Sequence, residues 1–68
     1  MSNILEVLQS AQANVENMRI LGFGLIPLVE AQLGNAIGLL EKGYPLDTDV
    51  DGILKHATVE YLPKYDGQ

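Results

Sequence analysis

Apolar residues recur along residues 4–19 with the period of an α-helix. Successive members are mostly four or three residues apart, which places them on one face. They are Ile4, Val7, Leu8, Ala11, Val15 and Met18. Asn3 and Glu6 have the spacing of a capping box, so a helix is predicted over residues 3–20. The uncharged polar residues of its opposite face are Gln9, Ser10, Gln12, Asn14 and Asn17. We interpret this face either as an ordinary hydrated surface or as a hydrogen-bonding contact surface.

A second helix is predicted over residues 27–42, after a break in the pattern. The Gly-Phe-Gly sequence at 22–24 interrupts the first helix because glycine disfavours helical structure, and Pro27 suits the first turn of a new helix. The apolar face of this second helix consists of Val29, Leu33, Ala36, Ile37 and Leu40. It matches the face of the first helix, which predicts an antiparallel helical hairpin with Phe23 filling its closed end. Gly43 is placed to end the second helix in a left-handed conformation.

A short third helix is predicted over about residues 49–62. Its apolar positions are Val50, Ile53, Leu54, Ala57 and Tyr61, and Pro63 would end it. A strand over residues 58–62 is the competing interpretation. Residues 64–68 are expected to form a flexible tail, and residues 1–63 a single domain. The predicted fold class is therefore all-α.

The stretch from Ile20 to Leu40 stands out because Glu30 is the only formal charge in 21 residues. A chain of 68 residues without cysteine has a small core and no disulfides, so oligomerisation is the expected source of further stability. A stripe of small residues allows a second helix backbone to approach closely. The second helix has such a stripe outside its predicted intramolecular face, formed by Ala31, Gly34 and Gly38. Leu28 and Leu39 flank the stripe. These five residues are predicted to form the interface of a homo-oligomeric helical bundle.

The same stretch has the length of a membrane span. Its glycines, Pro27, Gln32 and Asn35 disfavour that interpretation, and no lysine or arginine cluster flanks it. The N-terminus also lacks the basic and apolar regions of a secretory signal. We therefore expect a cytoplasmic protein, with a membrane-inserted hairpin as the alternative.

Three aspartates before the third helix resemble part of a calcium-binding loop. Asp47, Asp49 and Asp51 occupy the spacing of the first three ligands of an EF-hand, but Thr58 stands where the loop needs a bidentate glutamate. The alternative is that Thr48 caps the third helix and the aspartates favour its positive end. The sequence therefore predicts no metal site and leaves these aspartates as weak candidates for a calcium-binding module.

No pattern of catalytic residues is present, so neither an enzyme nor a cofactor is predicted. The net charge of −5 disfavours nucleic acid as a partner, since phosphate binding requires clustered lysine and arginine. The predicted function is that of a small interaction protein, an adaptor, inhibitor or sequestering protein of a kind typical of bacterial or viral regulation. Its predicted contacts with another protein or a small ligand are Phe23, Gln9, Gln12 and Tyr44.

Overall fold

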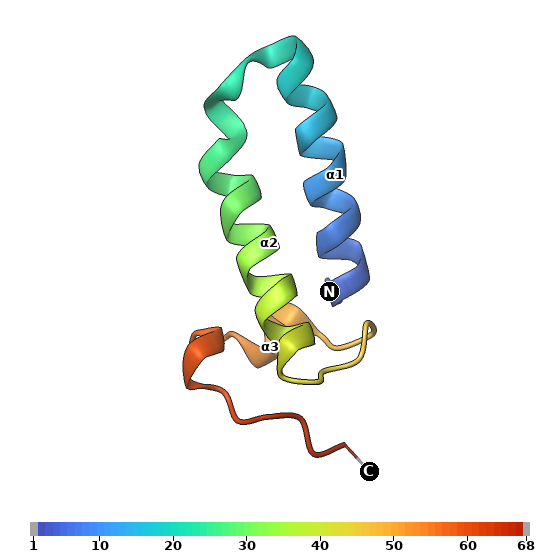
Figure 1. Ribbon diagram of the computed structural model, residues 1–68, viewed down its shortest axis with the longest axis vertical. Coiled ribbons are helices and arrows are strands. Elements are labelled where there is room, and N and C mark those ends of the chain that lie inside the picture. The colour runs from blue at the N-terminus through green and yellow to red at the C-terminus, as the bar shows by residue number, and fades with distance from the viewer. Residues whose placement is uncertain (1, 68) are drawn as a thin grey trace.

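The computed structural model describes residues 2–67, and two long helices dominate it. Helix α1 (Ile4–Leu21) and helix α2 (Ile26–Glu41) form an antiparallel hairpin, joined by the 3₁₀ turn η1 (Phe23–Leu25) (Figure 1). The short helix α3 (Val50–Ile53) and the 3₁₀ turn η2 (Val59–Tyr61) lie at the open end of the hairpin. No strand occurs within residues 2–67. The predicted all-α hairpin is confirmed.

The start of α1 is fixed by hydrogen bonds that the sequence predicts in part. The Asn3 side chain accepts from the Glu6 backbone N–H (2.8 Å), and the Glu6 carboxylate accepts from the Asn3 N–H (2.9 Å), which confirms the capping box. The N–H of Leu5 has no partner within the helix and donates to the carbonyl of Leu46 (3.1 Å). The loop before α3 therefore covers the first turn of α1.

Two glycines with positive φ end the long helices. Gly22 (φ 85°) follows α1, and Gly43 (φ 91°) follows α2, as the sequence predicts for Gly43. After α2, the N–H of Gly43 donates to the Leu40 carbonyl and the N–H of Tyr44 to the Leu39 carbonyl. This is a Schellman motif, in which a residue beyond the helix also packs against its last turn.

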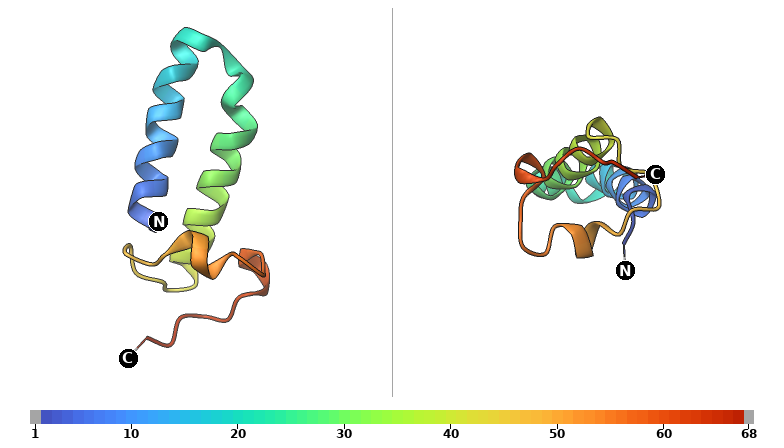
Figure 2. Two further views of the ribbon diagram at one scale, coloured as in Figure 1. Left: turned by 180° about the vertical axis from the view of Figure 1, so that it is seen from behind. Right: turned by 90° about the horizontal axis from the view of Figure 1, so that it is seen from below.

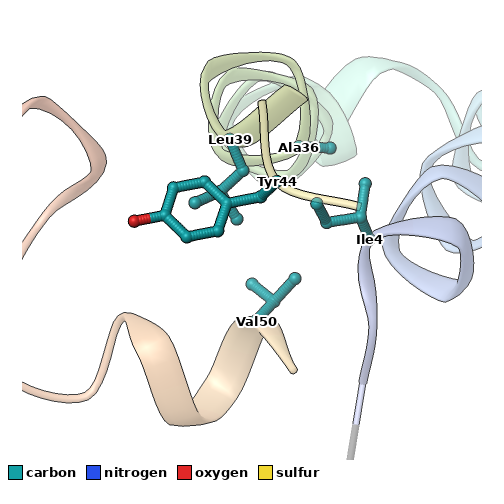
Figure 3. Packing of buried hydrophobic residues seen from close by; sticks show 5 residues of the cluster. All are labelled: Ile4, Ala36, Leu39, Tyr44 and Val50. Carbon is teal, nitrogen blue, oxygen red and sulfur yellow. The ribbon is translucent and has the colours of Figure 1, made fainter. Parts of the chain in front are cut away.

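The core is small and lies at the open end of the hairpin. Its buried cluster consists of Ile4, Ala36, Leu39, Tyr44 and Val50. In Figure 3 these side chains converge from α1, from α2 and its C-terminal loop, and from the start of α3. The Tyr44 hydroxyl donates to the carbonyl of Pro63 (2.8 Å), so its polar group is satisfied although the ring is buried.

The segment after α2 differs from the prediction. The prediction of a continuous helix over residues 49–62 is wrong, because α3 ends at Ile53 and a separate turn, η2, follows. The strand over 58–62 is equally absent. Gly52 within α3 and the lack of a long apolar partner surface explain why the helical period does not produce three turns.

The end of the chain is held in part by contacts with the fold. The N–H of Tyr65 donates to the Lys42 carbonyl (2.7 Å), and its ring lies 5.2 Å from that of Tyr44. Lys42 also donates through its ammonium group to the carbonyl of Leu62. Tyr65 therefore packs against the end of α2, whereas the sequence predicts a flexible tail from residue 64.

Helix α2 is rotated about its axis relative to the prediction. Its buried residues are Val29, Ala36 and Leu39, whereas Leu33, Ile37 and Leu40 are exposed. Because α2 is apolar on almost every side, the periodicity alone could not decide which arc faces α1. The contacts of Leu39 with the Tyr44 loop and α3, which follow α2 in the chain, settle the rotation.

Candidate interaction surfaces

A set of polar side chains joins the two long helices on one side of the hairpin. Asn14 Nδ2 donates to Gln32 Oε1 (3.1 Å), and Gln32 Nε2 donates to Ser10 Oγ (3.0 Å). We call these three residues the polar bridge. The bridge fixes the level at which the helices pack, with residue 32 of α2 between residues 10 and 14 of α1. Part of the uncharged face of α1 is therefore an intramolecular contact.

Helix α3 lies on the same side as the polar bridge. Leu39 follows Gln32 by seven residues, about two helical turns, so both lie on the same side of α2. Leu39 also belongs to the same buried cluster as Val50, the first residue of α3, so α3 lies on that side as well. Figure 1 and the reversed view in Figure 2 show α3 on one side of the hairpin, with no other segment over the opposite side along its upper part. One broad side of the hairpin is thus left uncovered by residues 2–67.

The uncovered side carries large apolar residues from both helices. In each helix the buried residues form the central arc that faces the other helix. A rotation of 100° per residue places the polar bridge on one flank of this arc and the large apolar residues on the other flank, in α1 and in α2 alike. They are Leu8, Val15, Ile26, Leu33, Ile37 and Leu40. We call them the front face. Leu8 is half-buried, and the other five are 36–48% exposed. In soluble proteins, large exposed apolar surfaces are typical of contact sites, which makes the front face a candidate for one.

The closed end of the hairpin is a second apolar surface. The side chains of Ile20, Leu21 and Phe23 are 84%, 73% and 76% exposed, and we call these residues the tip. Phe23 does not fill the closed end as predicted, because η1 directs the chain so that its ring lies outside. Together with Met18 and Arg19 it lines an open hollow of about 570 Å³.

The acidic loop contributes to the fold rather than forming a cluster of ligands. The Asp49 side chain accepts from the Gly52 N–H (3.2 Å) and so caps α3. Asp51 accepts from the N–H of Ser2 (3.1 Å), and Val50 donates to the Ser2 carbonyl (2.8 Å). The prediction that Thr48 is the cap is wrong by one residue. Within residues 2–67 no group of three or more acidic or histidine side chains is placed to hold a metal ion, so Asp47, Asp49 and Asp51 are not brought together.

The predicted oligomer interface is divided by the structure. Leu39, which the sequence predicts at the interface, is fully buried inside the protomer. Gly38 lies under Val59, since a Cβ atom at Gly38 would come within 2.7 Å of the Val59 side chain; it serves a contact within the chain. Leu28, Ala31 and Gly34 remain exposed, and Gly34 has open space around it.

The predicted partner contacts also separate into two groups. Tyr44, which the sequence predicts at a partner surface, lies in the core of the protomer, where the Schellman motif brings it into the same buried cluster as Leu39. Phe23, Gln9 and Gln12 are exposed. Ile20 and Leu21 are exposed beside Phe23 although the sequence pattern did not mark them as contacts; the signal was their position just before Gly22, which places apolar residues at a chain reversal.

Comparison of the chain with protein-family models, with curated proteins and with solved structures finds no match. Among residues 2–67, one helical stretch, Phe23–Glu41, is long and apolar enough to cross a membrane by length and composition, and 17% of its most apolar window is buried. A mostly buried core helix of a soluble protein meets the same criterion, but this stretch is largely exposed within the described residues, so its length and composition alone do not decide between the two interpretations.

Proposed function

We propose that this chain is a small, non-enzymatic interaction protein of the cytoplasm that associates with itself and binds a protein partner through helical surfaces. The observation that supports the proposal is the imbalance between buried and exposed apolar residues. Among residues 2–67, seven hydrophobic residues are buried, whereas thirteen large ones are exposed. A core of this size stabilises a 68-residue chain only marginally, and association is the usual remedy.

The two apolar surfaces suit two different contacts. The front face is broad and includes residues of both helices, which fits a helix-to-helix contact with a second copy. The tip is narrow, lies at one end of a molecule 43 Å long, and presents Phe23 and Arg19 together. Aromatic residues and arginine are enriched in partner contacts, so we assign the tip to another protein.

The proposal is tested by the mass of the protein in solution without detergent. Light scattering after size exclusion, and native mass spectrometry across a range of concentrations, should give a multiple of 7.4 kDa. A protein that stays monomeric at all concentrations up to about millimolar contradicts self-association. The native spectrum would also reveal any ligand retained in the hollow beside Phe23.

A membrane-inserted hairpin is the second candidate, favoured by the length and composition of Phe23–Glu41. The two candidates differ in a flotation experiment with neutral lipid vesicles. An interaction protein stays in the aqueous fraction, whereas an inserted hairpin floats with the vesicles and resists extraction with salt. Flotation of most of the protein would favour the membrane candidate.

A further inference from the structure

We infer that the front face is covered by a second copy of this chain, and that the two hairpins pack antiparallel in a four-helix bundle, with α2 against α2 and α1 against α1. This inference rests on the proposed self-association and adds to it the surface and the geometry. The front face, rather than the small-residue stripe at Ala31 and Gly34, is then the dimer interface. Three observations support the arrangement.

The first observation is the shape and size of the uncovered side. Both helices contribute large apolar residues to it, and the broad side of the molecule measures 43 × 20 Å (Figure 1). A stable interface buries about 800 Å² on each partner and therefore needs a surface that extends over both helices, as the front face does. A two-fold symmetric contact uses the same surface on both copies, so one apolar face is sufficient.

The second observation is the spacing of the apolar residues along the hairpin. The polar bridge sets residues 32–33 of α2 beside residues 11–12 of α1. In α2, Ile26 and Leu40 lie seven residues before and after Leu33. In α1, Leu8 and Val15 lie at equal distances before and after the midpoint between residues 11 and 12. A two-fold axis crossing the hairpin at this level would therefore bring Leu33 against Leu33, Ile26 against Leu40 and Leu8 against Val15 of the second copy. The residues match because their spacing is symmetric.

The third observation is the distribution of charge. Residues 8–40 contain only Glu16, Arg19 and Glu30, whereas the rest of the chain contains seven acidic residues and three lysines, most of them at the open end. Hairpins packed in parallel would bring two acidic ends together. Antiparallel packing separates these ends by much of the 43 Å length of the molecule, which exceeds the screening length of about 8 Å at physiological salt.

The chain has no cysteine, so single cysteines report the arrangement directly. In the full chain under mild oxidation, Leu33→Cys is expected to form a covalent dimer, because both copies of residue 33 lie at the two-fold axis. Ile26→Cys alone and Leu40→Cys alone should remain unlinked, whereas their mixture should give a heterodimer. Gly34→Cys, which lies outward on the same turn, is the control for random collision. Linkage is read on non-reducing gels and by intact mass.

Parallel packing predicts the opposite pattern, because residue 33 would face α1 of the second copy and the mixture of Ile26→Cys and Leu40→Cys would stay unlinked. A native mass of a dimer without linkage through Leu33→Cys overturns this inference and leaves the proposed function in place. A monomeric mass overturns both. Linkage through Gly34→Cys instead would assign the interface to the small-residue stripe.

A second measurement does not depend on disulfide geometry. Ile37→Asp places a charge on the front face of each copy, so it should raise the dissociation constant of the dimer by about a hundredfold or more while helical content is kept. Gly34→Asp introduces the same charge three residues away on the outward side and should leave the constant within about threefold. Equal weakening by both variants would contradict the assignment of the front face.

Discussion

Leu39 and Leu40 are neighbouring leucines in different environments, and their truncation tests the observed rotation of α2. Leu39 is fully buried, whereas Leu40 is 39% exposed. Leu39→Ala removes a core side chain and leaves a cavity, which costs about 2–5 kcal/mol. Leu40→Ala removes a side chain that is partly hydrated in the monomer, so we expect a cost of about 1 kcal/mol. The helix propensity of the two variants is the same, which makes them a matched pair.

The size of the expected difference determines the assay. A chain of 68 residues has a free energy of unfolding of about 3–10 kcal/mol, so the Leu39→Ala variant should lose about half of its stability. Urea unfolding followed by circular dichroism at 222 nm should show this at every protein concentration. The effect of Leu40→Ala should be small in dilute solution and increase with concentration, because the proposed dimer is the state in which its front-face contact forms. If Leu40→Ala costs as much as Leu39→Ala at the lowest concentration, the observed rotation of α2 is refuted.

Three further outcomes are expected from single substitutions. Asp49→Ala should lower the free energy of unfolding by about 1 kcal/mol, because the α3 cap is lost, and Thr48→Ala should lower it by less. If urea unfolding shows the larger loss for Thr48→Ala, then Thr48 is the cap. Gly43→Ala should cost about 1–2 kcal/mol because φ is positive there, whereas Gly34→Ala, in open space within α2, should stabilise by about 0.5–1 kcal/mol; a neutral Gly43→Ala would contradict the Schellman geometry. Phe23→Ala should change the melting temperature little, since the ring is exposed, while reducing capture of a partner or retention of a ligand; a large loss of stability would instead place Phe23 in the core.

The sequence was sufficient for the parts of the fold that depend on neighbouring residues. The capping box of Asn3 and Glu6, the break around Gly22 and the left-handed Gly43 are all short-range features, and the structure has each of them. The antiparallel hairpin follows from the same local information, because a short connection between two amphipathic helices leaves few other arrangements. These features needed no knowledge of the tertiary contacts.

The failures come from contacts between residues far apart in the chain. The sequence predicts a third helix that is too long because its apolar period is detectable, whereas in the structure only Val50 of α3 is buried, and Ile53 and Leu54 pack half-buried against the core. The cap was placed at Thr48 because the pairing of Asn3 with Asp49 joins the chain start to this loop and is invisible in a local pattern. Tyr44 looked free for a partner because nothing in the sequence indicated that Pro63 would supply a carbonyl for its hydroxyl.

The orientation of α2 shows why the candidate interface was harder to predict than the fold. Two apolar arcs of this helix are comparable in size, and hydrophobicity alone makes either suitable for the contact with α1. The choice is made by polar and long-range contacts: Gln32 reaches Ser10 and Asn14 only with the observed arc inward, and Leu39 then meets Tyr44. The two hydrogen bonds of Gln32, one part-buried and one exposed, lie at the edge of the helix contact and favour this packing by a modest net free energy. The arc that remains outside is consequently the more uniformly apolar one, with Ile26, Leu33, Ile37 and Leu40 exposed. The same interactions that select the inward arc leave the front face available for a second chain.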